Sequence, residues 1–211
     1  MALLKNRAEA AERLLILLAE YITDDVELFA IPRGGVPIAY VIAKAIGKQI
    51  EVVMVKKIGH PAHPEYAIGA VTLQTEIITI QEGIPASYIQ SQIKSIRKKL
   101  EERYTYFMGN MEPNAIRGKT VIIVDDGIAT GNSMLAAIQL IRSEGPKKII
   151  VAAPIIPPDT MQKLQLDADE VVYLYAPEPF LSVGRHYDEF RQLTDQQVKL
   201  QLSEAYSYAN E

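Results

Sequence analysis

The sequence predicts an α/β protein built on a Rossmann-like parallel sheet with helices on both faces. Apolar runs rich in β-branched residues, such as Val121–Val124 and Ile149–Val151, are typical of strands buried on both faces. These runs alternate along the chain with apolar residues at helical spacing. Strands alternating with helices predict parallel pairing through right-handed crossovers.

The composition is that of one soluble globular domain over residues 1–211, with 48% hydrophobic and 23% charged residues. The net charge of −4 argues against non-specific nucleic-acid binding. The chain has no cysteine, which excludes disulfides, thiolate metal sites and a cysteine nucleophile. Neither a signal pattern nor an apolar stretch of membrane-spanning length is visible. We therefore expect a cytoplasmic protein without membrane or nucleic-acid partners.

The elements follow from periodicity and from turn residues. The expected strands of the sheet cover residues 26–31, 50–55, 121–124, 148–153 and 171–175. The expected helices cover residues 5–22, 38–45, 86–106, 159–166 and 195–209, with a further helix beginning near Met134. Gly47 is expected to end the second helix.

The segment after the second strand departs from this alternation. Lys56 and Lys57 are expected at the end of that strand, and residues 58–66 are expected to form a loop because they contain glycine and two prolines. Residues 67–73 and 76–80 then predict a β-hairpin or two short strands. The charged helix 86–106 is interpreted as having a solvated face rather than an anion-binding one.

The strongest functional signal follows the strand Val121–Val124. Asp125 and Asp126 stand at its carboxyl end, where ligands bind in open α/β sheets. The small residues and hydroxyls of the next turn lead into a helix, whose free N–H groups and dipole favour a phosphate. Carboxylates instead suit sugar hydroxyls or a divalent cation. Together they predict a site for a sugar phosphate with Mg²⁺, although two acids can also simply end a strand and Thr130 or Ser133 can simply cap a helix.

This run resembles the ribose-5-phosphate motif of the type I phosphoribosyltransferases: an apolar strand, two acids, two free positions, Ala-Thr-Gly and a small or hydroxyl residue. The resemblance implies that the acid pair holds the ribose hydroxyls of phosphoribosyl pyrophosphate and binds Mg²⁺. It also implies that the next turn binds the 5-phosphate, through Gly127, Ala129, Thr130, Gly131, Asn132 and Ser133. Asn132 stands where many members carry Gly or Thr, which leaves a backbone role intact.

The same resemblance implies a fold with a core over about 23–175, a small hood over about 176–191 and a C-terminal helix over about 195–209. The first helix is a second candidate for the hood. Acceptor recognition varies among members of this family and lies in the hood.

The turn Pro32-Arg33-Gly34-Gly35 is the second site element, because it also lies between a strand and a helix. Glycine amides can approach an anion closely, and Arg33 adds a positive charge. The resemblance assigns this turn to the pyrophosphate, with a strained or cis peptide expected at Arg33–Gly34. By itself the segment could also be a plain Gly-Gly turn. Lys56 and Lys57 resemble the basic pair that lies near the pyrophosphate in several members.

Two groups of side chains stay open. His60 and His63 lie in the expected loop, where we interpret them as surface residues or, alternatively, as a phosphate contact or general acid rather than metal ligands. The C-terminal segment carries a cluster that could stack on a planar acceptor or merely pack the segment onto the sheet: Phe180, Arg185, His186, Tyr187 and Phe190.

The sequence therefore predicts a Mg²⁺-dependent transferase that moves ribose 5-phosphate from phosphoribosyl pyrophosphate to a small-molecule acceptor, such as a nucleobase, with release of pyrophosphate. Arg33, Lys56 and Lys57 would neutralise the leaving group, and Asp125 and Asp126 would hold the ribose. The alternatives are a non-catalytic sensor of a nucleotide or of phosphoribosyl pyrophosphate, and a phosphorylase or hydrolase of nucleotides. Retention of Arg33 and of the lysine pair favours the enzyme. A homodimer is compatible with all of these functions.

Overall fold

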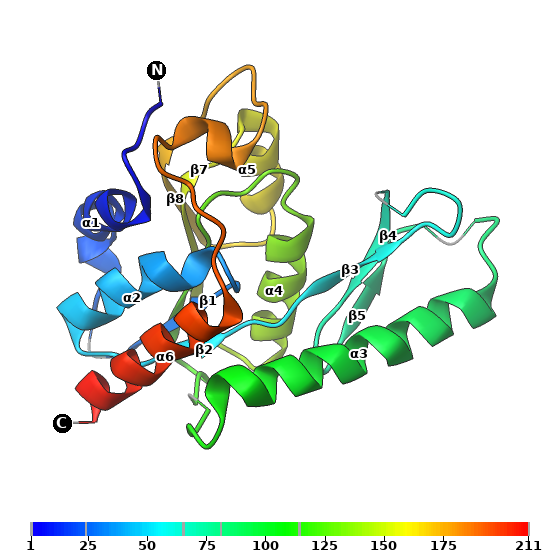
Figure 1. Cartoon of the computed structure of the whole chain (residues 1–211), viewed down its shortest axis with the longest axis horizontal. Helices are drawn as coiled ribbons and strands as arrows, with labels where there is room; N and C mark the ends of the chain where they lie inside the picture. The colour runs from blue at the N-terminus through cyan, green and yellow to red at the C-terminus, as the bar shows by residue number, and fades with distance from the viewer. Residues whose placement is uncertain (1, 24, 65, 81, 114, 211) are drawn as a thin grey trace.

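The computed structural model describes residues 2–23, 25–64, 66–80, 82–113 and 115–210. Its centre is a parallel five-stranded sheet in the order β2-β1-β6-β7-β8 (Figure 1). The strands are β1 (Val26–Ala30), β2 (Ile50–Val52), β6 (Thr120–Val124), β7 (Lys148–Ile155) and β8 (Glu170–Tyr175). The predicted parallel α/β sheet is confirmed, with strand bounds close to those expected except at β2.

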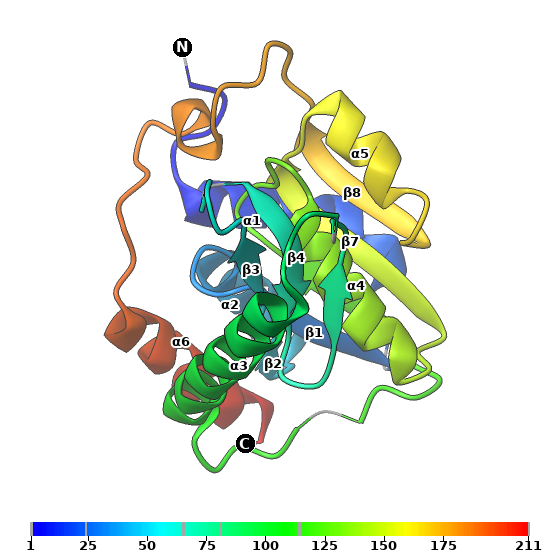
Figure 2. The ribbon, with the colours of Figure 1, turned by 90° about the vertical axis from the view of Figure 1, so that its right-hand side faces the viewer.

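Helices cover both faces of the sheet (Figures 1 and 2). Helices α1 (Arg7–Leu18) and α2 (Gly35–Ile46) pack on one face, and α4 (Asn132–Ser143) and α5 (Pro158–Leu164) pack on the other. Alternate residues of one strand serve the two faces: Ile122 and Val124 lie in the first core, whereas Val121 and Ile123 lie in the second. This two-sided burial is why the strand reads as an unbroken apolar run.

An arm projects from the β2 edge of the sheet (Figure 1). It consists of an antiparallel sheet of β3 (Lys56–Gly59), β4 (Ala67–Val71) and β5 (Glu76–Ile78), followed by the long helix α3 (Ala86–Met108). The predicted hairpin is confirmed.

The expected extent of the second strand was wrong. Strand β2 ends at Val52, and Lys56 and Lys57 begin β3 instead of ending β2. Both lysines pair with β4 in antiparallel register. The backbone hydrogen bonds of this segment are therefore made in the arm and not in the central sheet. The segment that was expected to be a loop accordingly starts as a strand.

Residues 176–191, called the hood segment below, contain only the short 3₁₀ helix η2 (Val183–His186) as regular structure. The segment runs beside the N-terminus (Figure 1). The backbone N–H groups of Leu3 and Leu4 each donate to the carbonyl of His186 at 3.0 Å. In return, those of Asp188 and Glu189 donate to Leu4 at 2.9 Å and Lys5 at 2.8 Å. The N-terminal residues and the hood segment thus lie side by side.

Helix α6 (Asp195–Ala209) has the predicted bounds. A capping box begins it: the Thr194 side chain accepts from the N–H of Gln197, and the Gln197 side chain accepts from the N–H of Thr194. The helix packs against α2 and α3 and so links the arm to the core.

Candidate active site

Two turns meet at the carboxyl edge of the sheet, because β1 and β6 are neighbouring strands with Ala30 opposite Val124. Gly34 and Gly35 allow the close approach of these turns. A Cβ on Gly34 would overlap the carboxylate of Asp126, and one on Gly35 would overlap the carbonyl oxygen of Val124. Any side chain at either position would push the turns apart, so this contact explains the Gly-Gly pair.

The Gly-Gly pair belongs to the start of α2, which begins at Gly35 and not at the expected Ile38. A cis peptide bond is present, as expected in this turn, but it lies at Pro32–Arg33 and not at Arg33–Gly34. The predicted position was thus wrong by one peptide bond, and Gly34 itself has ordinary helical angles, with φ −62° and ψ −38°.

The turn after the acid pair has the geometry of an anion site. Gly131 caps α4 with a left-handed φ of 76°, and α4 begins at Asn132. Within the described residues, the backbone N–H groups of residues 129–133 donate no hydrogen bond. Free amides at a helix N-terminus, beside the hydroxyls of Thr130 and Ser133, bind a phosphate well.

Helix α5 supports this turn from the side. The Thr160 hydroxyl donates to the carbonyl of Ala129 at 2.6 Å, and the Lys163 ammonium donates to the Asn132 side chain at 3.0 Å. The sequence analysis assigned neither residue to the site. Both residues lie on α5, which follows β7, the neighbour of β6 in the sheet. Their proximity to the turn after β6 therefore depends on the order of the strands and not on a sequence motif.

The two acids differ in their surroundings. Asp126 is only 8% exposed, and its Oδ2 accepts from both Nε and Nη2 of Arg7 at 2.7 Å. Asp125 is partly exposed, and its Oδ1 accepts from the backbone N–H of Asp126 at 2.8 Å. Both acids thus lie at the carboxyl end of β6 as expected, but the structure buries Asp126 against Arg7.

Burial raises the pKa of both carboxyl groups. For Asp125 the pKa lies well above its usual range, first because of desolvation and second because of the negative charge of Asp126. For Asp126 desolvation is again the largest cause, but the positive charge of Arg7 opposes it. Arg7 thus stabilises the ionised form of Asp126 through both its charge and its hydrogen bond, and that of Asp125 through its charge alone.

Arg33 is held much less tightly. Its Nη1 lies 3.4 Å from Oδ1 of Asp195, the first residue of α6, and the two side chains are 37% and 40% exposed. The same oxygen accepts from Nη2 of Arg103, on α3, at 2.6 Å. Two guanidinium groups thus share one carboxylate, and the cluster keeps a net positive charge.

A cavity of about 480 Å³, called the hood-side cavity, joins these groups. It is lined by Arg7, Arg33, Gly34 and Asp126 from the body of the protein and by Val183, Phe190, Arg191, Gln192 and Leu193 from the hood segment and the residues after it. The mixture of cationic groups and one buried acid fits an anionic ligand that also carries hydroxyls.

The other predicted side chains lie elsewhere. Lys56 and Lys57 are exposed on the arm and do not line the hood-side cavity. The rings of His60 and His63 stack at 5.7 Å between β3 and β4. Among the described residues, no group of three or more His, Cys, Asp or Glu side chains could hold a metal ion.

The aromatic side chains of the hood segment pack mainly against their neighbours. Tyr187 is 5% exposed, stacks on Phe190 at 5.0 Å and donates its hydroxyl to the carbonyl of Asp126 at 2.7 Å. The Arg7 guanidinium covers the Phe190 ring at 3.9 Å. These contacts favour the packing alternative for Tyr187 and Phe190. Phe180 stacks on His186 at 5.7 Å and stays partly exposed, and Arg185 is exposed.

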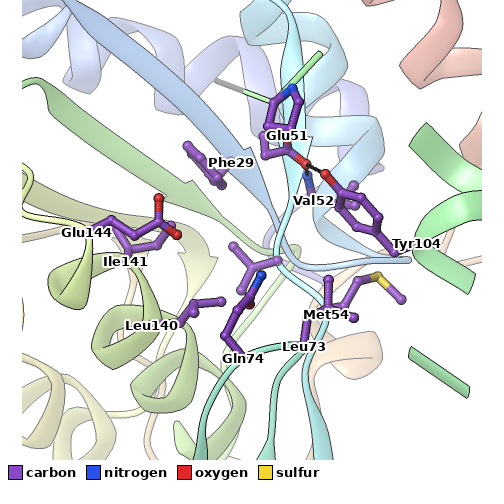
Figure 3. Close-up of a pocket in the computed structure, with 12 residues that line it drawn as sticks. Phe29, Glu51, Val52, Met54, Leu73, Gln74, Tyr104, Leu140, Ile141 and Glu144 are labelled. Carbon is purple, nitrogen blue, oxygen red and sulfur yellow. Dashed lines mark hydrogen bonds between the residues drawn. The ribbon is translucent and has the colours of Figure 1, made fainter. Parts of the chain in front are cut away.

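A second cavity, of about 380 Å³, lies between the β2 edge, α3 and the end of α4 (Figure 3). Its polar lining includes Glu51 and Glu144, and none of the described residues around it is Lys, Arg or His. Figure 3 shows the Glu51 carboxylate accepting from the Tyr104 hydroxyl, at 3.0 Å. An acidic lining repels a polyphosphate, so the hood-side cavity is the better candidate site.

A sequence profile described as the phosphoribosyl transferase domain matches residues 2–174. The chain belongs to this family. The match ends before the hood segment, the region in which the acceptor side was expected. The α/β fold of the type I members, expected from the central motif, is thereby confirmed.

Similar proteins carry names of the same family. Two proteins of Mycobacterium tuberculosis, "Putative phosphoribosyl transferase MT0597" and "Putative phosphoribosyl transferase Rv0571c", are each 33% identical over 211 residues, which is 98% of this chain and 48% of each relative. The chain thus spans about half the length of these curated relatives.

Solved structures are similar as well. The crystal structure of TT1426 from Thermus thermophilus has a TM-score of 0.82 at 33% identity, covering 95% of this chain and 98% of that one. A hypoxanthine phosphoribosyltransferase from Staphylococcus aureus shares the fold at a TM-score of 0.50 and 14% identity, covering 90% of this chain and 85% of that one. In the described part of the chain, no helix has both the length and the apolarity needed to cross a membrane.

Proposed function

We propose that the protein is a phosphoribosyltransferase that moves ribose 5-phosphate from phosphoribosyl pyrophosphate to a small-molecule acceptor. The observation that carries this proposal is the contact between two turns on neighbouring strands. One turn offers an acid pair and a phosphate-binding helix N-terminus, and the other offers Arg33 with two glycines. A phosphate, a sugar and a pyrophosphate can therefore be bound side by side.

The proposed chemistry needs no covalent intermediate with the protein. The bond between C1 of the ribose and the pyrophosphate oxygen breaks, and a bond forms between C1 and the acceptor nucleophile. C1 gains positive charge as the leaving group departs, so stabilisation is electrostatic and positional. The free amides of residues 129–133 would hold the 5-phosphate, and Arg33 with the amide of Gly34 would hold the pyrophosphate, since the amide of Gly35 already donates to the carbonyl of Ile31 at 3.0 Å. Asp125 would accept from the ribose hydroxyls and stabilise the positive charge at C1.

The donor set also suits Mg²⁺. This ion is usually held by one or two carboxylates together with substrate phosphates. Among the described residues, the carboxylate of Asp125 accepts only from the backbone N–H of Asp126, whereas Oδ2 of Asp126 is already engaged by Arg7. Asp125 and the phosphates of the donor would hold the ion, which would supply positive charge near the departing pyrophosphate. A contribution from Lys56 and Lys57 stays a prediction, because both lie on the arm.

The alternative function is a sensor that binds the donor or a nucleotide without turnover. The buried Arg7–Asp126 pair favours it in one respect, because an engaged acid is less available to a sugar. The loosely held Arg33 favours the enzyme, because a sensor has no leaving group to stabilise. Nucleotide phosphorolysis or hydrolysis would use the same site and differ only in what attacks C1.

Two measurements test the proposal. Phosphoribosyl pyrophosphate with Mg²⁺, at about a hundred times its dissociation constant, should stabilise the fold by about 2.7 kcal/mol and raise Tm. No shift at saturating donor would refute donor binding. Release of pyrophosphate that depends on an added nucleobase would support transfer. Donor binding without release, across nucleobases, phosphate and water, would instead support the sensor.

A further inference from the structure

The Arg7–Asp126 pair joins three separate parts of the chain. Arg7 is the first residue of α1, Asp126 follows β6, and the hood segment lies against both. The guanidinium uses Nε and Nη2 for Oδ2 of Asp126, each at 2.7 Å, and Nη1 for the carbonyl of Arg191 at 3.0 Å. Its face lies 3.9 Å from the centre of the Phe190 ring.

The backbone of Asp126 is tied to the hood segment as well, since its carbonyl accepts from the buried Tyr187 hydroxyl. Gly34 closes over the carboxylate, where even a methyl group would overlap it. Both ion-paired side chains are only 12% exposed. Asp126 is thus covered on several sides, whereas Asp125 keeps an exposed portion.

We propose that Asp126 acts through Arg7 as a positioning residue that holds the hood segment over the site. The proposal rests on the proposed function for the donor that this site binds. It differs from the equal roles that the sequence motif implies for the two acids. In this arrangement Arg7 and Asp126 form one unit, called the hood clasp.

The hood clasp predicts a pattern among variants. Removing either partner leaves the other as a buried, unpaired charge, so Arg7→Gln and Asp126→Asn should have the same effect. The double variant should lose no more than either single one, since groups in one ion pair are not additive. If Asp126 instead bound ribose directly, Arg7→Gln would release it, and only Asp126→Asn would weaken donor binding.

The experiment measures two properties in these three variants and in Asp125→Asn. Donor affinity is measured with phosphoribosyl pyrophosphate and Mg²⁺, and hydrogen exchange is followed at the amides of Asp188 and Glu189, which bond to the N-terminal residues. Arg13→Gln is the matched control, because Arg13 lies on the same helix and contacts Glu9 and Tyr175 away from the site. It should leave both properties unchanged.

We expect exchange at Asp188 and Glu189 to accelerate in Arg7→Gln, in Asp126→Asn and in the double variant, with donor affinity falling about tenfold in each. Asp125→Asn should weaken the donor without faster exchange. If a Gln or Asn variant does not fold, Arg7→Lys keeps the charge with fewer hydrogen bonds and should show intermediate exchange.

Wild-type donor affinity in Arg7→Gln, together with a loss in Asp126→Asn, would overturn the proposal. Unchanged exchange in Arg7→Gln would overturn it as well. Failure of the wild-type protein to bind the donor would refute the proposed function and the ribose assignment of Asp125. The exchange rates would still decide whether the hood clasp exists.

Discussion

Two of the three arginines that line the hood-side cavity, Arg7 and Arg33, each pair with an aspartate, and the two pairs differ in distance and in exposure. The Arg7–Asp126 pair has two contacts of 2.7 Å between side chains that are 12% exposed. The Arg33–Asp195 pair has one contact of 3.4 Å between side chains that are 37% and 40% exposed. Burial separates an arginine that holds the structure together from an arginine that is available to a ligand.

The energetic reason is solvation. An exposed ion pair is worth about 0–1 kcal/mol, because water replaces either partner at little cost. Arg33 can therefore exchange Asp195 for phosphate oxygens, and Arg103 remains to neutralise Asp195. Separating a buried pair leaves an uncompensated charge, at a cost of several kcal/mol. Arg7 is therefore not expected to leave Asp126 for a ligand.

The largest expected effect tests this contrast through stability. Arg7→Gln should lower the free energy of unfolding by about 3–5 kcal/mol, whereas Arg33→Gln should change it by at most about 1 kcal/mol. Urea denaturation of the two variants measures both values. Equal losses would show that the burial of the pairs does not determine their strength, and the contrast between the two arginines would fail.

An effect of intermediate size concerns the ligand. Arg33→Ala should weaken pyrophosphate by about 10- to 100-fold, because a hydrogen bond to a charged group contributes about 1.5–3 kcal/mol. Binding of ribose 5-phosphate should change little, since its phosphate would lie at the amides of residues 129–133. Calorimetric titration of both compounds, each with Mg²⁺, makes the comparison. A larger loss for ribose 5-phosphate would mean that the two phosphate sites have been interchanged.

The smallest expected effect concerns pH, and it has opposite signs at two acids. The pKa of Asp195 is lowered below 3.8 because the hydrogen bond from Arg103, its Coulombic attraction and then Arg33 outweigh desolvation. The folded state then binds fewer protons than the unfolded state, so ionised Asp195 stabilises the fold above pH 3.8, and this stabilisation is lost as pH falls through the lowered pKa. Because solvent screens the exposed ion pair, the contribution of Asp195 to the free energy of unfolding stays below about 1 kcal/mol.

At Asp125 the pKa is raised, so the folded state binds more protons than the unfolded state above pH 3.8. Its contribution is present below that value and is lost as pH rises through the raised pKa. Urea denaturation of wild type, Asp195→Asn and Asp125→Asn at a series of pH values above and below 3.8 measures the contributions of the two acids. The advantage of wild type should grow with pH relative to Asp195→Asn and shrink relative to Asp125→Asn. Parallel curves would contradict the difference in environment.

Sequence reasoning worked best where the cause of a structure is local. Helix α6 begins and ends where periodicity and capping residues indicate, and the run from Val121 through Gly131 forms the strand, turn and helix start that its residue types require. It failed at Lys56 and Lys57. The mostly apolar residues 50–55 that precede them are equally compatible with one long strand or with two strands in different sheets. That choice depends on which partner strand is available, and partners are distant in the sequence.

The sequence by itself determined the family, the parallel α/β sheet and the residue types of the two turns, because strand patterns and helix N-termini depend on neighbouring residues. Only the tertiary structure decided that Asp126 is buried against Arg7, 119 residues away, while Asp125 stays partly exposed. Adjacent identical residues carry the same local signal. Their difference arises from what packs over each one, and that packing is set by the return of the N-terminus and the hood segment across the edge of the sheet.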